Sequence, residues 1–181
     1  MKPKIVLIVA AAQINRVIGK SNNELPWPRI PGDMQNFRKE TLGYPVIMGR
    51  VTFETFPKNE ETGLPKPLPK RLNIVITRNP EYKAPEGVLI VASQEEALQK
   101  AQECSLEKIC IIGGEQIYEM FLSLADEISY TEIKLIVSGT TKFPQIPDCF
   151  KIISRESRSE DVTNEGKEET IVFEIQKWIK K

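Results

Sequence analysis

Four short apolar segments along the chain predict the middle of a β-sheet. They are rich in β-branched residues, nearly free of polar interruptions, and cover residues 5–12, 45–48, 72–77 and 108–112. A strand that is covered on both faces reads in this way, because neither face alternates with polar residues. We therefore expect buried strands near the centre of one sheet.

Helical patterns lie between and after these segments. They cover residues 33–42, 51–56, 93–104 and 115–124. Ser93, followed three residues later by Glu96, is typical of a capping box at the start of a helix. Strands that alternate with helices favour parallel pairing, so the sequence predicts an α/β fold.

The last part of the chain follows a different pattern. Residues 170–178 alternate between apolar and polar, and a turn signal of Asn, Glu and Gly stands at residues 164–166. One face would be apolar and the other polar: Ile171, Phe173 and Ile175 against Glu174 and Gln176. Such alternation indicates an antiparallel hairpin, which would close the edge of the sheet.

Length and loops indicate the domain organisation. A chain of 181 residues is long enough for one hydrophobic core and short for two, so we expect a single domain over residues 1–181. Residues 13–31 and 57–70 are irregular and long for simple connections in a compact domain. Loops of this length usually carry function.

Charge narrows the class of partner. The chain has 25 Lys and Arg against 25 Asp and Glu, so it lacks the basic field that holds nucleic acid or an anionic membrane. Its apolar segments fall short of the roughly 20 residues that cross a bilayer. The N-terminal apolar segment is too short for a signal peptide, and cleavage would remove a strand. We expect a small-molecule partner and a cytoplasmic location.

Histidine and cysteine usage limits the chemistry. The count of histidines is 0, which excludes Ser-His-Asp triads, Cys-His dyads and zinc motifs that contain histidine. Acid–base work must then fall to a carboxylate, Lys, Tyr, Cys or water. The cysteines, Cys104, Cys110 and Cys149, form no Cys-x-x-Cys pair and stand among apolar residues, which predicts buried reduced thiols.

Glycine turns and arginines predict a phosphate site. Gly113-Gly114 lies between a buried strand and a helix, where backbone N–H groups and the positive helix end can face an anion. Gly49-Arg50 makes a second turn of this kind, and Arg78 follows a third strand. Each feature alone also fits a structural turn or a solvated charge. Together they suit a polyanionic cofactor that lies across strand ends.

One acidic residue is a candidate for catalysis. Asp33 stands where a helix begins, and position alone favours an N-cap or a first-turn charge. On a helix, however, Asp33 and Phe37 share a face, so a carboxylate would stand beside an aromatic wall if that face lines a pocket. This pair would fit a flat heterocycle with paired N–H donors, and burial would raise the pKa of the carboxyl.

Two proline-rich stretches also allow two interpretations. Residues 25–28, Leu-Pro-Trp-Pro, fit a rigid turn whose Trp packs on the core, and residues 67–71, Pro-Leu-Pro-Lys-Arg, fit a stiff approach to a strand. A guanidinium fixed at the end of the second stretch, that of Arg71, would also make a bidentate clamp for a substrate carboxylate.

A series of spaced motifs runs in order along nearly the whole chain. They lie at residues 8–19, 25–27, 33 with 37, 45–54, 67–74, 112–118 and 139–144. In these motifs the chain resembles the dihydrofolate reductase family. The resemblance implies a central mixed, mostly parallel eight-stranded sheet with flanking helices and a C-terminal antiparallel hairpin. It also implies hydride transfer from NADPH to 7,8-dihydrofolate, giving 5,6,7,8-tetrahydrofolate for one-carbon metabolism, in a monomer that binds antifolate inhibitors and needs no metal.

Carried over residue by residue, the resemblance assigns roles at the substrate site. Asp33 would bond the 2-amino group and N3 of the pterin and favour protonation at N5, with Thr131 supporting it from a neighbouring strand. Arg71 would bind the glutamate α-carboxylate. Further substrate contacts would come from Val9, Ala11, Leu25, Phe37, Thr52, Phe56, Leu68, Ile112 and Tyr118.

The resemblance also implies where the cofactor binds. The adenosine-side phosphates would lie near Gly49, Arg50, Val51, Thr52, Thr77 and Arg78. The pyrophosphate would lie at Gly113, Gly114, Glu115, Gln116 and Ile117, and the nicotinamide at Ala11 and Ile18. The peptide between the paired glycines would be cis, and residues 13–31 would form a mobile loop that closes over the nicotinamide.

The sequence departs from the family pattern at the loops. Thr140 stands where many bacterial members carry an acid that helps to hold the mobile loop closed. Residues 28–32 are one residue longer than in short bacterial forms, and residues 58–66 look inserted. These departures affect the loop and the pocket rim, and leave Asp33 in place.

Two alternatives fit parts of the pattern. The pyrimidine reductase of riboflavin synthesis has a similar structure and also uses NADPH, although the pair of Asp33 with Phe37 and the segment before Arg71 argue against it. A non-catalytic nucleotide-binding module would also keep the glycine turns. Decay of NADPH absorbance on adding dihydrofolate, stopped by an antifolate, separates all three.

Overall fold

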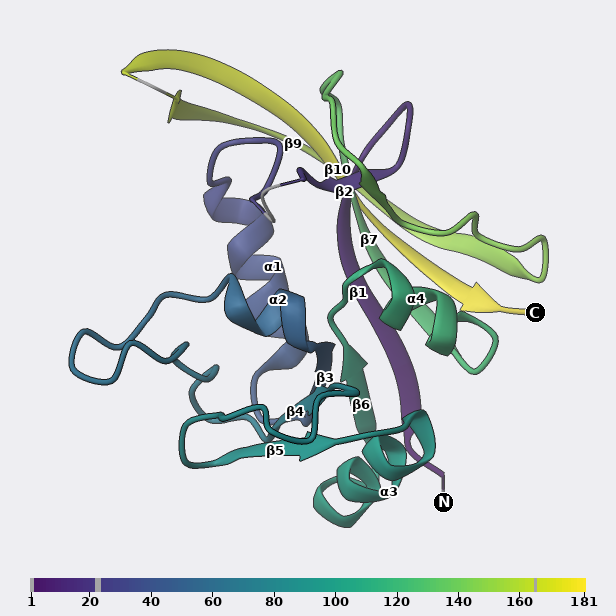
Figure 1. Cartoon of the computed structure of the whole chain (residues 1–181). Helices are drawn as coiled ribbons and strands as arrows, with labels where there is room; N and C mark the ends of the chain where they lie inside the picture. Colours follow the sequence, from purple (N-terminus) through teal and green to yellow (C-terminus); the bar gives the residue numbers. More distant parts are fainter. Residues whose placement is uncertain (1, 22–23, 165) are drawn as a thin grey trace.

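One eight-stranded sheet organises the protein (Figure 1). The computed structural model describes residues 2–21, 24–164 and 166–181. The strand order is β5-β4-β3-β6-β1-β7-β10-β9. The first six strands in this order run parallel to one another. Strand β10 is antiparallel to both of its neighbours, β7 and β9. The predicted single α/β domain, with a mixed, mostly parallel sheet and a C-terminal hairpin, is confirmed.

The strands have the following bounds. The large sheet holds β1 (Lys4–Ala12), β3 (Val46–Gly49), β4 (Asn73–Ile76), β5 (Val88–Val91), β6 (Lys108–Ile111), β7 (Glu127–Ile133), β9 (Phe150–Asn164) and β10 (Lys167–Lys180). A separate pair is formed by β2 (Val17–Gly19) and β8 (Thr141–Lys142). Four of these strands match the predicted buried segments. The turn predicted at residues 164–166 includes residue 165, which lies outside the described residues.

Four helices cover the sheet in the described part of the chain. They are α1 (Pro31–Thr41), α2 (Arg50–Glu54), α3 (Gln94–Cys104) and α4 (Glu115–Leu122). Alternate residues of β1 enter two different clusters, because successive side chains of a strand point to opposite faces. Leu7 packs with residues of α3 and α4, whereas Ile8 packs with Phe37 of α1 and Phe53 of α2. Both faces of the central strands are therefore buried, as their unbroken hydrophobicity predicts.

The helix ends follow local chemistry. Helix α1 begins two residues before the predicted start, because the fixed φ of Pro31 suits the first helical position. At α3 the Ser93 hydroxyl oxygen accepts from the N–H of Glu96 at 3.1 Å. The Glu96 carboxylate reaches the N–H of Ala92 instead of Ser93, so the predicted capping box forms in a displaced variant. Helix α4 ends at Leu122, before the predicted position 124.

The polar side chains predicted on one face of β10 are buried. Glu174 and Gln176 are only 9% and 4% exposed. They can be buried because they satisfy one another: the Gln176 amide donates to the Glu174 carboxylate at 2.7 Å. The Trp178 indole N–H in turn donates to Gln176 at 3.0 Å. The polar face of β10 is thus a buried, hydrogen-bonded row.

The prediction that the cysteines are buried is partly wrong. Cys110 is buried in β6 as predicted, and burial raises the pKa of its thiol to about 12. Cys104 and Cys149 are exposed, because one ends α3 and the other lies in the turn before β9. None of the helices in the described part of the chain combines the length and apolar character that a membrane span needs.

Candidate active site

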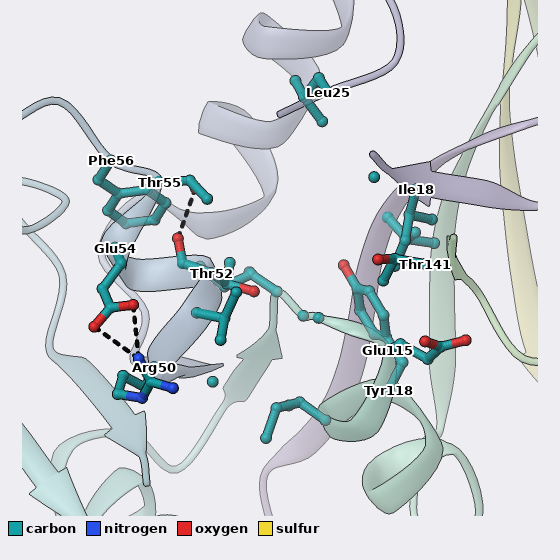
Figure 2. Close-up of a pocket in the computed structure, with 18 of the residues that line it drawn as sticks. Ile18, Leu25, Arg50, Thr52, Glu54, Thr55, Phe56, Glu115, Tyr118 and Thr141 are labelled. Carbon is teal, nitrogen blue, oxygen red and sulfur yellow. Dashed lines mark hydrogen bonds and ion pairs between the residues drawn. The ribbon is translucent and has the colours of Figure 1, made fainter. Parts of the chain in front are cut away.

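A cleft of about 1610 Å³ opens above the carboxyl ends of β1, β3, β4 and β6. Ligands of open α/β sheets bind at this edge, where loops and helix N-termini converge. Figure 2 shows the labelled side chains in two groups across the open space. Ile18, Tyr118 and Thr141 stand on one side, and Thr52, Phe56 and Arg50 on the other.

Asp33 projects into this cleft from the first turn of α1. It is not the N-cap, because that position belongs to Ile30, whose side chain cannot accept a hydrogen bond. Burial raises the pKa of the Asp33 carboxyl above its ordinary value of 3.8; a hydrogen bond with Thr131 of β7 lowers it, and the charge of Glu160 raises it further. Asp33 is therefore more than a first-turn charge, because its carboxyl is largely buried in the cleft.

Apolar side chains surround Asp33. The predicted contacts that line the cleft here are Val9, Leu25, Phe37, Phe56, Leu68, Ile112 and Tyr118. The Tyr118 hydroxyl donates to the carbonyl of Ile8 at 2.7 Å, and burial raises the pKa of this phenol far above its ordinary value. Tyr118 is thus a neutral wall with a fixed hydroxyl. The result is one carboxyl in an apolar niche that suits a flat ring with N–H donors.

Another part of the cleft has the features of a phosphate cradle. It is lined by Ile18, Gly49, Arg50, Val51, Thr52, Thr77, Arg78, Gly113, Gly114, Glu115, Gln116 and Ile117. A Cβ on Gly113 would lie 2.9 Å from the ring of Tyr118, and one on Gly114 would lie 3.3 Å from the Thr52 hydroxyl. The paired glycines, joined by a cis peptide as expected, therefore expose backbone where a side chain would fill the space. A dinucleotide phosphate fits this cradle.

One arginine of this cradle is paired with an acidic side chain. Arg50 forms an ion pair with Glu54 at 2.8 Å along α2, drawn as dashed lines in Figure 2. Arg78 is exposed two residues beyond the end of β4. The Glu115 carboxylate accepts from the backbone N–H of Lys142 at 3.2 Å, which ties the start of α4 to β8.

Two predicted site residues lie outside the cleft lining. Ala11 is fully buried in the core, whereas Val9 and Ala10 of the same strand line the cleft. Arg71 lines a neighbouring hollow of about 320 Å³, together with Arg38 and Leu68. Its guanidinium is held by the Pro69 carbonyl at 3.1 Å and by the Thr41 hydroxyl at 2.8 Å.

The structure also adds residues that the sequence did not single out. Ile8 and Ala10 line the cleft beside Val9, and Asn36 adds a polar group from α1. Trp27 is 7% exposed in the core, as one interpretation of its turn predicted, and also borders the cleft. Thr141 carried no local signal, since only the long-range pairing of β8 with β2 places it there.

The loops that depart from the family pattern are ordered by their own bonds. In the inserted segment, Lys58 and Pro65 form an isolated antiparallel bridge. The Asn59 side chain accepts from the N–H groups of Glu61 and Thr62, at 2.9 and 3.1 Å. Thr140 is exposed beside the β2–β8 pair. In the loop expected to be mobile, residues 13–31, positions 22 and 23 lie outside the described residues.

We expect Asp33→Asn to raise the free energy of unfolding at pH 7. Because burial raises the pKa of the folded carboxyl above 3.8, the unfolded chain loses this proton first as the pH rises. Ionisation therefore destabilises the fold above that pH, and asparagine removes the penalty. Thermal unfolding at pH 7 and pH 3 checks this, with a gain expected only at pH 7. A gain of the same size at both pH values would contradict it.

Comparison with known proteins agrees with this geometry. The family model described as dihydrofolate reductase matches residues 4–175. The chain is 40% identical over 140 residues to the type 3 dihydrofolate reductase of Salmonella typhimurium, covering 77% of this chain and 78% of that one. It is 34% identical over 172 residues to the dihydrofolate reductase of Bacillus subtilis, covering 94% of each.

A solved structure extends the likeness to three dimensions. Dihydrofolate reductase from Enterococcus faecalis, complexed with NADP(H) and RAB-propyl, superimposes with a TM-score of 0.79 at 29% identity. The match covers 98% of this chain and 96% of that one. A family match over nearly the whole chain, together with a shared fold, leads to one conclusion. The chain belongs to the dihydrofolate reductase family.

Proposed function

We propose that the protein transfers a hydride from NADPH to 7,8-dihydrofolate, giving 5,6,7,8-tetrahydrofolate. Membership of its family makes the chain an NADPH-dependent oxidoreductase. The observation that carries the finer proposal is Asp33, a carboxyl in an apolar niche beside a dinucleotide-sized cradle. The proposal keeps two expectations from the sequence, a monomer and a cytoplasmic location, and takes antifolates as inhibitors.

The cradle residues support the cofactor assignment. The backbone at Gly113 and Gly114 would receive the pyrophosphate at the start of α4, and Thr77 and Arg78 would hold the adenosine-side phosphate. When bound, NADPH supplies the hydride. The Enterococcus faecalis enzyme with this fold was solved in complex with NADP(H).

Asp33 would orient and polarise the substrate. Its carboxylate can accept the two N–H donors of the pterin edge, the 2-amino group and N3, while Phe37 packs against the ring. The same contact favours a proton at N5, where reduction requires one. The low dielectric of the niche strengthens this effect, and burial keeps the Asp33 pKa above its ordinary value. Tyr118 and Ile112 exclude water from the reacting face.

The proposal is tested by following NADPH absorbance with the purified protein. Decay should begin on adding dihydrofolate and stop on adding an antifolate. Absence of decay with folded protein would overturn the proposed reaction, and decay that an antifolate leaves unchanged would overturn the proposed site.

Arg78→Ala should weaken NADPH more than NADH. Arg78 lies at the cleft beyond the end of β4, where the 2′-phosphate of NADPH would meet it, and NADH lacks this group. We expect a loss of about tenfold or more in affinity for NADPH and less than about twofold for NADH. Fluorescence titration of both cofactors measures this, with Lys83→Ala on the same loop as control. Equal losses for the two cofactors would contradict the assignment.

A further inference from the structure

The outer hairpin touches the first turn of α1. The backbone N–H of Gly32 donates to the Glu160 carboxylate of β9 at 2.9 Å. A Cβ on Gly32 would lie 2.3 Å from that carboxylate and 2.9 Å from the ring of Phe173, so only glycine allows this contact. Because Ile30 cannot cap the helix with its side chain, Glu160 binds one of the unpaired N–H groups of the first turn. The next residue along the helix is Asp33.

Four side chains from three elements act on Asp33 or on Glu160. Thr131 of β7 forms a hydrogen bond with Asp33, which favours its ionised form. Tyr118 of α4 is a neutral phenol that faces Asp33. Glu160 of β9 disfavours the ionised form through its charge. Arg158, also on β9, donates to Glu156 at 2.8 Å and acts on Glu160 through space.

We propose that Glu160 is a positioning residue for the reduction, holding the first turn of α1 through Gly32 and presenting its negative charge to Asp33. The inference rests on the proposed role of Asp33. The charge of Glu160 makes ionisation of the buried Asp33 carboxyl less favourable, because ionisation would place a second negative charge nearby. The backbone bond fixes the helix turn that aims Asp33 into the niche. The β9–β10 hairpin, although remote from Asp33 in sequence, thereby shifts the pH range over which the reaction proceeds.

The variant Glu160→Gln separates the effect of the negative charge from the effect of the hydrogen bond to Gly32. Its amide oxygen can still accept from Gly32, but its negative charge is gone. We expect the midpoint of the pH profile for the hydride-transfer step to fall by about 0.5 to 1 pH unit. The matched control is Asp161→Asn, the next residue, which lies on the opposite face of β9 and accepts from the Thr170 hydroxyl at 2.6 Å. This control should leave the midpoint unchanged.

A direct measurement complements the rates. The ¹³C signal of the Asp33 carboxyl, followed by NMR from pH 3 to pH 9 in the full chain without ligand, should titrate at lower pH in Glu160→Gln than in Asp161→Asn. In the wild-type chain the backbone N–H of Gly32 should exchange slowly with solvent, because the Glu160 carboxylate accepts from it. This wild-type measurement tests the contact if Glu160→Gln does not fold.

Specific results would overturn the inference. Identical Asp33 midpoints in Glu160→Gln and Asp161→Asn would do so, as would a Gly32 N–H in the wild-type chain that exchanges as fast as an unprotected amide. The proposed function fails separately: if Asp33→Asn reduces dihydrofolate at the wild-type rate, then the role of Asp33 itself is wrong. If Asp33→Asn is slow while Glu160→Gln keeps the wild-type pH profile, only the role of Glu160 is lost.

Discussion

Replacing Asp33 with asparagine should lower the rate of hydride transfer to dihydrofolate by about 10²–10⁴ at neutral pH, the usual contribution of one acid–base group. Asparagine has nearly the same shape and can keep a bond with Thr131, but it cannot take both N–H donors of the pterin edge as a carboxylate does. It also cannot hold a proton for the ring. NADPH affinity should stay nearly intact, because the glycine cradle, and not Asp33, is proposed to hold the cofactor phosphates.

Single-turnover kinetics with NADPH and dihydrofolate measures the step, and fluorescence titration measures cofactor affinity. The loss should shrink as the pH falls, since solution then supplies the proton that the variant lacks. The matched control is Asp161→Asn, which makes the same chemical change on an exposed strand. A wild-type rate in Asp33→Asn at neutral pH would remove this carboxyl from the mechanism.

The same variant links stability to function. At pH 7 it is expected to stabilise the fold and to slow the reaction, because the buried carboxyl that destabilises the native state is the group proposed to bind substrate. Opposite signs of the two effects would be hard to explain for a residue whose only role is to start a helix, since loss of an N-cap destabilises.

Much of the central sheet could be predicted because its signals are local. The segment before Gly49 and the one before Gly113 are unbroken apolar runs that end in glycine, and such runs become buried strands whose ends meet at one edge. The same reasoning brought Arg50, Arg78 and the paired glycines to one cleft. These predictions needed only periodicity and the geometry of parallel sheets.

What the sequence could not predict depends on long-range pairing. Strand β9 is mostly polar and exposed, so nothing in residues 150–164 indicated that it would reach α1. The burial of Glu174 depends on the bond from Gln176, which the alternation of polar and apolar residues does not reveal. Thr131 was assigned through resemblance, and its place beside Asp33 follows from the register of β7 against β1. Glu160 had no signal at all, because its partner Gly32 is remote in sequence.

Replacing Arg71 with leucine should weaken dihydrofolate binding by about 2–5 kcal/mol, because a partly buried carboxylate would lose its cation. Arg71 lies in the hollow that adjoins the cleft, with Leu68 shared between the two. Burial lowers the pKa of its guanidinium, and the nearby cation of Arg38 lowers it further. Two like charges in one half-buried hollow are unfavourable unless an anion joins them, and the glutamate tail of folate supplies a carboxylate.

The decisive comparison uses a substrate without that tail. A reduced pterin that lacks the glutamate should bind Arg71→Leu as well as it binds the wild-type protein, because it carries no carboxylate for Arg71 to bind. Lys39→Leu, an exposed cation on the same helix as Arg38, controls for the general loss of positive charge. Equilibrium titration of both ligands against the three proteins gives the result. If the tailless pterin loses affinity as strongly as dihydrofolate does, then Arg71 acts on the helix through Thr41 rather than on the substrate, and the clamp is wrong.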